Sequence, residues 1–526
     1  MGQDISTAFN PPPLSLRQCF IDDKFSLPHY LIYRRRRNAA NQRFQNMISL
    51  LNQRNKRKFD DLDQCTSSSL SSYVHTRSVK KHRLMVRSES GDLREILPKD
   101  TLWYLLYVQS PLQNNRLKKM FRIRFRIPYC FFNELSHDIS NHELFSRWKF
   151  SDAVGSPPSN LKLLLLGSLR YIGRSWTFDD IYEANGISRE VNRNFFTAFI
   201  DYGSSVMYKK YVIDVAASID IANHEKLFSL AGMPGCIGSG DGTHIIMLNC
   251  PSWATNSHKV LKLNSPACTY NLTVSHTKLI LGSTTGHPST WNDKTLVLYD
   301  PLIAGVRDGT KYDDFEFTLY EKRHNGDIVE AKYKGVWFMV DNGYLDWSCT
   351  VPPVKDATTY QTIRFSEWLE SMRKDVECTF GILKQRFSIL RHGVRLSHIK
   401  NVDEIWLTCC ALHNKLLIMD GLHEDWGVGE SSNAESNSTT NTNVSNMQTP
   451  FSVNRLNRNF PDNLQHDPNS IIHSSLFDEY TIDGKRIIQK MPLKIFRQCL
   501  INHFDICFQM KSIKWPSKKK NTPSRI

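Results

Sequence analysis

Apolar positions between residues 159 and 203 recur with the 3.6-residue period of helices, in segments separated by polar breaks. Thr177 and Ser188 precede two of these segments, and hydroxyl side chains at such positions cap the first free N–H groups of a helix. A turn signal, Asn185-Gly186, lies between them. The pattern therefore predicts three helices with the rhythm of a helix-turn-helix unit. The predicted helices are 160–172, 177–184 and 188–200.

In a helix-turn-helix unit the start of the last helix faces the bases of DNA. Arg189, Asn192 and Arg193 occupy that place in the third predicted helix, so they are candidate DNA-binding residues. The same pattern is equally typical of a small helical bundle that only packs against the rest of the protein. The sequence leaves both interpretations open.

From residue 235 to residue 415 the pattern changes to short apolar or alternating runs followed by long periodic segments. Such an order predicts strands followed by helices, and hence a mixed sheet flanked by helices in an α/β fold. The predicted strands are 270–276, 279–284 and 337–341, and the predicted helices are 363–392 and 401–417.

The segment 121–127 alternates apolar residues and arginine. A period of two predicts a half-buried extended segment with a cationic outer face. That face is either an ordinary exposed surface or a DNA contact.

The ends of the chain are more polar than its centre. Residues 1–100 are polar and basic, and residues 429–449 are rich in Ser, Asn and Thr. Such compositions predict a largely disordered arm and a flexible linker. We therefore expect a helical, helix-turn-helix-like region over 101–230, an α/β domain over 235–420, and a C-terminal helical extension with a basic tail over 450–526.

Charge is concentrated at the N-terminus. The chain has 526 residues and a formal net charge of +15, and residues 1–127 hold 24 Lys and Arg against 10 Asp and Glu, a net +14. A basic arm of this kind, with Arg34, Arg35, Arg36 and Arg37 in one run, indicates a polyanionic partner such as nucleic acid. The alternative is a solvated tail without a specific partner.

Targeting signals and cysteines also bear on the compartment. Several Lys- and Arg-rich clusters are candidate nuclear-import signals, so we expect a nuclear protein. The 12 cysteines contain no CxxC pair, which gives no support to a zinc-binding framework and fits a reducing compartment. The longest apolar stretch is too short to span a bilayer, so no membrane association is expected.

Three acidic residues lie where ligands of divalent cations would be expected. Asp241 lies in a strand of small residues, Asp341 ends the apolar run 336–340, and Glu377 borders the apolar stripe of a predicted helix. A carboxylate is costly to bury unless it is paired or binds a metal. Two hard divalent cations held by such oxygens can activate water and stabilise the leaving oxygen of a phosphodiester. Taken singly, each Asp is equally consistent with a turn, and Glu377 with a solvated helix face.

Other polar residues of this region are weaker candidates. The acids Asp293, Asp300, Asp308, Asp313 and Asp314 crowd polar segments, where solvated side chains are the rule, and we interpret them as such. Lys384 lies near the face of the predicted helix that carries Glu377, and it is a further candidate DNA contact.

The acids lie in three motifs, 238–245 (GSGDGTHI), 340–344 (VDNGY) and 373–390 (RKDVECTFGILKQRFSIL). Other motifs of the same region are 270–274 (YNLTV), 285–288 (TGHP) with 291–294 (WNDK), and 411–414 (ALHN). No single one of these motifs is specific, but their order is. The ordered set resembles the DDE transposases of the PIF/Harbinger superfamily over about residues 120–415.

This resemblance implies a ribonuclease H-like nuclease domain with Asp241, Asp341 and Glu377 as its catalytic triad. It also implies two Mg²⁺ or Mn²⁺ ions held by these residues, DNA as substrate, and strand transfer after hydrolysis. From the family we further expect a homo-oligomer on DNA and a Myb/SANT-like DNA-binding partner protein. The main alternative is a domesticated, non-cutting scaffold that binds DNA or chromatin, and a ribonuclease with the same metal chemistry is a third interpretation.

Overall fold

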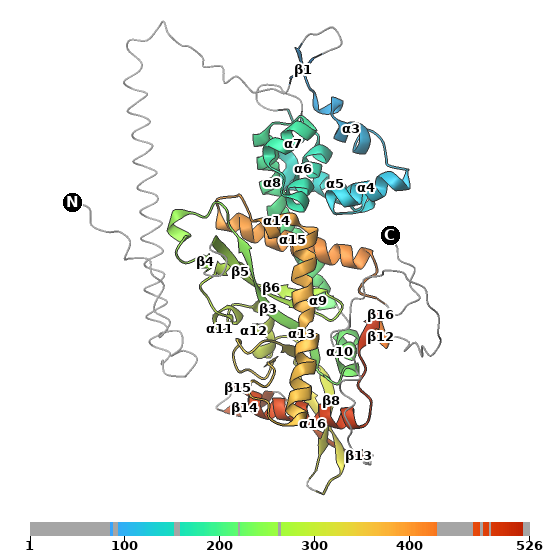
Figure 1. Cartoon of the computed structure of the whole chain (residues 1–526), viewed down its shortest axis with the longest axis vertical. Coiled ribbons are helices and arrows are strands. Elements are labelled where there is room, and N and C mark those ends of the chain that lie inside the picture. Colours follow the sequence, from blue (N-terminus) through green and yellow to red (C-terminus); the bar gives the residue numbers. More distant parts are fainter. Residues whose placement is uncertain are drawn as a thin grey trace, which may run out of the picture. The chain divides into compact units, whose positions relative to one another are not determined.

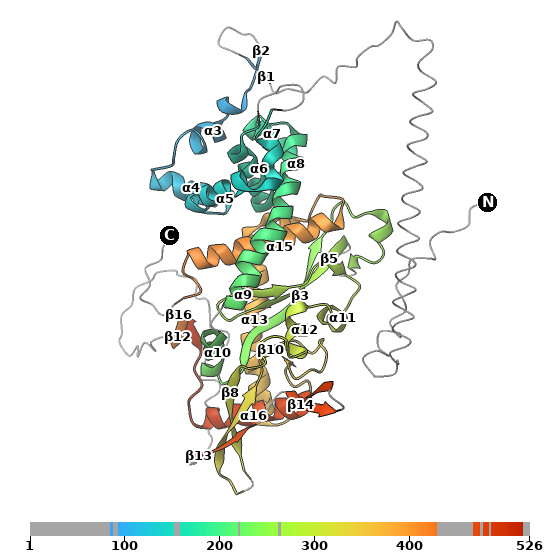
Figure 2. The ribbon, with the colours of Figure 1, turned by 180° about the vertical axis from the view of Figure 1, so that it is seen from behind.

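The computed structural model describes most of the chain beyond the basic arm, and all of the described residues belong to one compact unit, Arg83–Ile526. The predicted disordered arm, with Arg34 to Arg37, and the predicted linker 429–449 lie outside these residues. The described ranges are 85–87, 93–151, 158–218, 221–260, 265–323, 325–424, 426–428, 466–473, 477–482 and 485–518. They form a mixed α/β fold, as predicted (Figures 1 and 2).

The helices before residue 203 confirm the three predicted from the apolar period. They are α6 (Leu161–Arg174), α7 (Phe178–Asn185) and α8 (Arg189–Tyr202). Thr177 accepts a hydrogen bond from the backbone of Asp180 and Ser188 accepts one from Val191, as their predicted capping roles require. The turn between α7 and α8 depends on Gly186, which ends α7 with φ of 69°.

The prediction of an extended segment over 121–127 is wrong, because residues 121–125 are helical. They form the end of α4 (Asn115–Phe125), which Asn114 caps by accepting from the backbone of Arg116 and Leu117. Phe121 and Phe125 lie four residues apart and share the buried face, while Ile123 between them is 58% exposed. In so short a run the alternation fits a period of two, but burial follows the helical spacing.

Other helical segments complete this region. They are η2 (Pro98–Asp100), α3 (Leu102–Tyr107), α5 (Tyr129–Asn141), η3 (Glu143–Trp148), the π-helical η4 (Gly203–Met207) and η5 (Lys209–Ile213), α9 (Asp214–Ser218) and α10 (Ile221–Leu230). The region packs on α15 (Ile399–Met419), where a side chain at Gly203 would come 2.2 Å from Thr408 Oγ1. Only glycine permits that approach.

The main sheet has the order β11-β10-β3-β5-β4, with β6 and β7 also paired to β5. The central strand β3 (Cys236–Ile246) runs antiparallel to β5 (Ser265–Val274) and parallel to β10 (Trp337–Met339). The sheet is therefore mixed, as predicted. Its other strands are β4 (Lys259–Val260), β6 (Ile280–Ser283), β7 (His287–Pro288) and β11 (Thr350–Val351).

The long helix α13 (Tyr360–Arg386) packs against β3, β5 and β10, and α14 (Ser388–His392) continues it (Figure 1). Short helices on the sheet are η6 (Ser252–Ala254), α11 (Asp293–Val297) and α12 (Pro301–Arg307). The smaller sheets comprise β1 (Met85–Arg87) with β2 (Leu93–Glu95), β8 (Glu316–Lys322) with β9 (Ile328–Lys334) and β13 (His466–His473), β12 (Trp426–Val428) with β16 (Pro516–Lys518), and β14 (Phe477–Ile482) with β15 (Lys485–Lys490).

The predicted C-terminal helix is present as α16 (Leu493–Gln509). Its Phe496, Leu500 and Phe504 are buried in one cluster with Trp337 of β10 and Trp368 of α13. This helix is therefore part of the hydrophobic core beneath the α/β sheet. No helix among the described residues is both long and apolar enough to cross a bilayer.

Candidate active site

Asp241 lies in the middle of β3, between two glycines. Its Oδ1 accepts a 2.7 Å hydrogen bond from the backbone N–H of Gly242. The side chain is only 22% exposed. Burial raises the pKa of Asp241 to about 6, and the nearby carboxylates of Asp341 and Asp293 act in the same direction.

Asp341 reaches the same place from the neighbouring strand. β10 pairs in parallel with β3, with Met339 opposite Ser239, so two residues further along lie Asp341 and Asp241. The chain turns there, and the backbone N–H of Gly343 donates a 2.8 Å hydrogen bond to Asp341 Oδ1. Parallel pairing thus brings the two predicted aspartates together at one edge of the strands.

Glu377 lies on α13 and is linked to Asp241 by Arg373, which forms ion pairs with both. The Arg373 guanidinium donates to Asp241 Oδ2 at 3.1 Å and to Glu377 Oε1 at 3.0 Å, and its Nε donates to Glu370 Oε2 at 3.0 Å. Arg373 is 12% exposed, whereas Glu377 is 48% exposed. These three carboxylates raise the pKa of Arg373 against the opposing effect of its burial.

A further acid lies beside the two aspartates, which corrects the interpretation of Asp293 as a solvated acid. Asp293 starts α11, and a Cβ added at Gly343 would lie 2.7 Å from its Oδ2 and 3.0 Å from Asp341 Oδ1. Burial raises the pKa of Asp293, and the charge of Asp341 adds to this effect. The signal in the sequence was its place in the TGHP…WNDK match, which local polarity alone did not distinguish.

Asp300 is a second correction among those acids, since its side chain is fully buried. Its Oδ1 caps α12 by accepting from the backbone of Leu302 and Ile303, and its Oδ2 accepts from Asn271 Nδ2 at 2.7 Å. Asn271 also accepts from the hydroxyl of buried Tyr344. These hydrogen bonds form a polar support under the aspartate pair.

The donor chemistry of this site fits a hard divalent cation. Asp241, Asp341 and Asp293 supply carboxylate oxygens, and the charge of Asp341 adds to the effect of burial in raising the pKa of Asp241 and of Asp293. A bound cation relieves such repulsion. Among the residues that the structure describes, however, no group of three or more His, Cys, Asp or Glu surrounds a point that could hold a metal ion. The cationic group between Asp241 and Glu377 is the guanidinium of Arg373.

Lys384, a predicted DNA contact, lies close to Asp241 in the fold. Its Nζ donates a 3.0 Å hydrogen bond to Oγ1 of Thr243, which is two residues from Asp241 on β3. Burial lowers the pKa of this lysine. The side chain therefore carries its charge to the inner face of α13 beside the acids.

The three predicted recognition residues of α8 separate into two kinds. The prediction that Asn192 contacts DNA is wrong, because the residue is only 3% exposed. Its Nδ2 donates a 2.7 Å hydrogen bond to the carbonyl of Ile187, and its Oδ1 accepts one of 2.9 Å from Asn185. It holds the α7–α8 turn together and cannot reach DNA. Arg189 pairs with Asp179 at 3.3 Å and is exposed, and Arg193 lies over the ring of Phe178.

Arg189 and Arg193 line a cavity of about 630 Å³ between α7, α8 and the segment 395–401. Arg395 and His398 contribute further basic groups to its wall. The charge of this cavity wall is compatible with an anionic partner.

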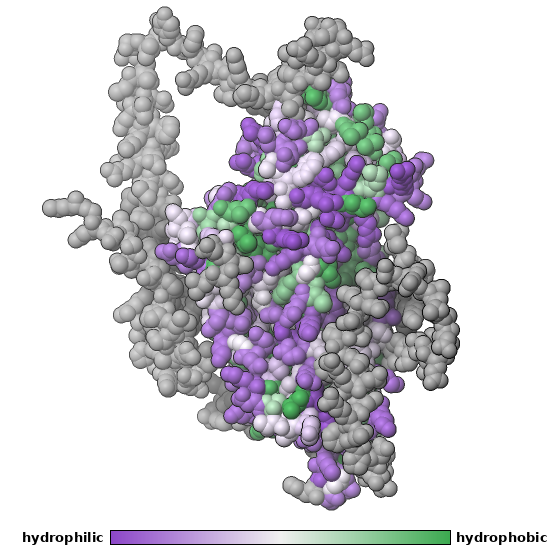
Figure 3. Space-filling model, in the orientation of Figure 1, coloured by the Kyte–Doolittle hydropathy of each residue, from purple (hydrophilic) through white to green (hydrophobic). Residues whose placement is uncertain are grey.

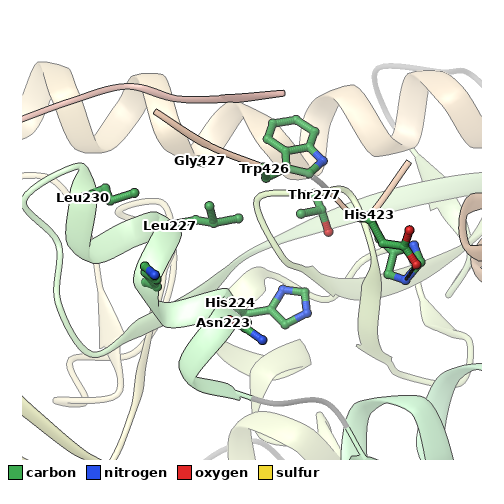
Figure 4. A pocket seen from close by; sticks show the side chains of 10 residues that line it. Asn223, His224, Leu227, Leu230, Thr277, His423, Trp426 and Gly427 are labelled. Carbon is green, nitrogen blue, oxygen red and sulfur yellow. Dashed lines mark ion pairs between the residues drawn. The ribbon is translucent and has the colours of Figure 1, made fainter. Parts of the chain in front are cut away.

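A second cavity, of about 440 Å³, lies between α10 and β12. Figure 4 shows His224, Leu227, Thr277 and Trp426 around it. None of the predicted site residues that the structure describes lines this cavity.

Comparison with known proteins bears on the region that carries these acids. Residues 210–424 match the family model described as plant transposon protein. The chain is also similar to the protein ALP1-like of Arabidopsis thaliana, with 23% identity over 275 residues. The match covers 52% of this chain and 64% of that relative, so the chain spans less than two thirds of the relative's length. No solved structure matches the chain.

Proposed function

We propose that the chain is a metal-dependent DNA endonuclease and transposase of the Harbinger type, because residues 210–424 match the plant transposon protein family and the chain is similar to an ALP1-like protein. Its substrate would be DNA at the terminal repeats of a transposon, and its fold would be of the ribonuclease H-like type. The observation that carries the proposal is the convergence of Asp241, in the middle of β3, and Asp341, just past the end of the neighbouring strand β10.

In this proposal Asp241, Asp341 and Glu377 would hold two Mg²⁺ or Mn²⁺ ions. When bound, the ions would supply an activated water and neutralise charge on the scissile phosphate. Asp293 adds a fourth carboxylate beside Asp341, and Lys384 and Arg373 are the cationic side chains next to the acids. The Gly242 and Gly343 N–H groups orient the two aspartates.

The reaction then has two displacements at phosphorus. In the first, the oxygen of water attacks, the bond to the 3′ oxygen breaks, and that oxygen takes a proton and leaves as a hydroxyl. In the second, this hydroxyl attacks a target phosphodiester and displaces its 3′ oxygen. Neither step needs a covalent bond between protein and DNA.

Further parts of the proposal concern location and partners. We propose that the chain acts in the nucleus as a homo-oligomer on DNA, with a Myb/SANT-like protein supplying additional DNA contacts. Its support is the basic sequence composition and the family membership. The second candidate function, a non-cutting scaffold that binds DNA or chromatin, is favoured by a specific observation, the Arg373 guanidinium between Asp241 and Glu377.

The test is to incubate the full chain with Mg²⁺ or Mn²⁺ and labelled DNA that carries the element's ends, beside an Asp341→Asn variant. Cleavage at the element boundary that needs the metal and is lost in the variant would support the endonuclease. Equal DNA binding without cleavage in both proteins, with the partner protein present, would favour the scaffold. A matched control is Asp314→Asn, which removes one exposed acid from a polar segment of the same domain.

A further inference from the structure

Four arginines meet where α4 and α6 end. Arg124 lies in the last turn of α4 and Arg126 is its C-terminal cap, while Arg170 and Arg174 lie one turn apart at the end of α6. Arg126 lies directly against α6, since a Cβ at Gly173 would come 2.8 Å from its Cγ. We call these four residues the α4–α6 arginine cluster.

Three of the four guanidinium groups of the cluster donate to neutral hydrogen-bond acceptors. Arg170 donates 2.8 Å to the carbonyl of Arg124, and Arg174 donates 3.0 Å to the carbonyl of Ile123. Arg124 donates 2.7 Å to the hydroxyl of Tyr107. Among the ion pairs formed by the described residues, none involves a member of the cluster. The cluster therefore gathers positive charge without a compensating acid of its own.

Part of this arrangement has an ordinary structural explanation. Arginines near the C-terminal end of a helix satisfy its last carbonyls and interact well with its dipole, and Arg170 and Arg174 do so for α4. That role leaves the Nε atoms of Arg126, Arg170 and Arg174 unexplained, because all three are buried without a hydrogen-bond partner. Unsatisfied buried donors of charged groups are costly, so an acceptor that reached these three groups would relieve that cost.

The electrostatic environment agrees with this geometry. Burial, together with the charges of Arg174 and Arg124, lowers the pKa of Arg170 to about 10. Burial and Arg174 also lower the pKa of Arg126. An anion placed among these groups would remove both the repulsion and the missing hydrogen bonds.

The cluster is separate from the candidate active site. It extends toward Arg386, whose pKa is lowered by burial and, to a lesser extent, by Arg122 and Arg126. Arg386 follows Glu377 by nine residues on α13, which is about 14 Å along the helix and half a turn around it. A ligand on the cluster would therefore lie away from the acids, on another face of α13. Hydrophilic residues dominate the surface over this helical region in Figure 3.

We propose that the α4–α6 arginine cluster binds backbone phosphates of DNA outside the segment held in the candidate active site. The planar fork of a guanidinium matches the oxygens of a phosphate, and several such groups together suit a chain of phosphates. The proposal rests on the proposed function in one respect, namely that the polyanion is DNA. It assigns a role to Arg124 and Arg126 of the segment 121–127, which the nuclease chemistry leaves unused.

The test measures binding of the full chain to a labelled duplex by fluorescence anisotropy, in chelator and over a range of salt concentrations. Arg126→Gln with Arg174→Gln should weaken binding by roughly tenfold at low salt and reduce the slope of log K against log salt by about two. Arg126→Lys with Arg174→Lys keeps both charges and should keep most of that slope.

The matched control is Lys118→Gln with Lys119→Gln, which removes the same charge from exposed positions of the same helix. It should change affinity far less than the arginine pair. Equal effects of the two pairs, or no effect of the arginine pair in a protein whose circular dichroism and Tm are unchanged, would overturn the cluster. So would unchanged DNA binding together with loss of binding to polyglutamate, which would indicate an acidic protein partner.

Failure of the arginine-cluster proposal can be distinguished from failure of the endonuclease proposal. If the chain cuts DNA in Mn²⁺ but binds it equally well without the arginine pair, DNA binding by the cluster is overturned and the endonuclease proposal still holds. A chain that binds through the cluster but never cuts supports the cluster and favours the scaffold. A chain without affinity for DNA overturns both.

Discussion

Arg373 of α13 and Asp241 of β3 form an ion pair of 3.1 Å, in which one guanidinium nitrogen contacts Asp241 Oδ2 while the other donates to Glu377. The guanidinium therefore neutralises the two predicted metal ligands at the same time. A divalent cation and this guanidinium would compete for the same carboxylate oxygens. The cutting function needs these oxygens for metal, whereas the non-cutting function leaves them to Arg373, so the position of Arg373 is the structural feature that separates the two proposed functions.

The first prediction concerns Arg373→Gln. In the metal-free protein the loss of the guanidinium leaves Asp241, Glu370 and Glu377 without their cation, which should lower the free energy of unfolding by about 1–3 kcal/mol. Two of these partners are substantially exposed, with Glu377 at 48%, so the cost should stay well below that of a fully buried pair. Mn²⁺ should raise the Tm of the variant more than that of the wild type.

Lys374→Gln is the matched control, since it removes the same charge from the adjacent, exposed position of α13. Thermal unfolding of the three proteins with and without Mn²⁺ checks the prediction. If Mn²⁺ shifts the Tm of wild type and Arg373→Gln equally, the guanidinium does not compete with the metal.

The sequence predicted those features of the site that depend on single elements. A run of small residues and an apolar run place Asp241 and Asp341 on neighbouring strands, and helical periodicity places Glu377 on α13. The partnership of Arg373 could not be read in this way. Glu370 and Glu377 share its helix face in the sequence pattern, but the contact with Asp241 depends on how α13 packs against β3.

Asp293 was missed for a similar reason. Its neighbourhood in the sequence is polar, which predicts a solvated side chain, but the chain after β7 returns it beside Gly242 and Gly343 of two other segments. Only the glycines leave room for it there. The prediction that Asn192 contacts DNA was wrong for the opposite reason. The start of a recognition helix predicts an exposed side chain, but the α7–α8 turn buries this residue.

The second prediction concerns Asp293→Asn. The change keeps the shape of the side chain but removes one of three crowded carboxylates, so the affinity for Mn²⁺ should fall. Cleavage at saturating metal should fall less than in Asp341→Asn, because Asp293 lies beside Asp341 and outside the family triad. Titration of Mn²⁺ by its effect on Tm checks the affinity independently of cleavage. Unchanged affinity would show that Asp293 only packs.

The third prediction concerns Asn192→Ala. Its amide connects the carbonyl of Ile187 with the side chain of Asn185 inside the α7–α8 turn. Removing it leaves buried polar groups unpaired and should cost about 1–3 kcal/mol of stability, as measured by urea unfolding. DNA affinity below the unfolding transition should not change. Arg193→Gln, one residue away, should give the reverse pattern, and a specific loss of DNA affinity in Asn192→Ala would restore it as a recognition residue.

The last prediction concerns acid unfolding and rests on His413 of α15, which is completely buried. Its Nε2 donates 2.9 Å to the carbonyl of Lys278, and its Nδ1 lies 3.3 Å from Nη1 of Arg386, from which a neutral ring accepts. Burial, and then the charge of Arg386, lower the pKa of His413 to about 3. Between pH 6.5 and 3 the folded protein therefore keeps this imidazole neutral, whereas the unfolded chain would protonate it.

A folded-state pKa below the unfolded value of about 6.5 makes the contribution of His413 fully present above pH 6.5. It should be lost progressively as the pH falls toward 3, by about 1.4 kcal/mol per pH unit. His413→Gln can still donate to Lys278 and accept from Arg386 without titrating, so its free energy of unfolding should depend less steeply on pH between 6.5 and 4. His392→Gln removes an exposed histidine of α14 and should leave the slope unchanged. Urea unfolding at several pH values measures the difference, and equal slopes for wild type and His413→Gln would mean that His413 is not held neutral.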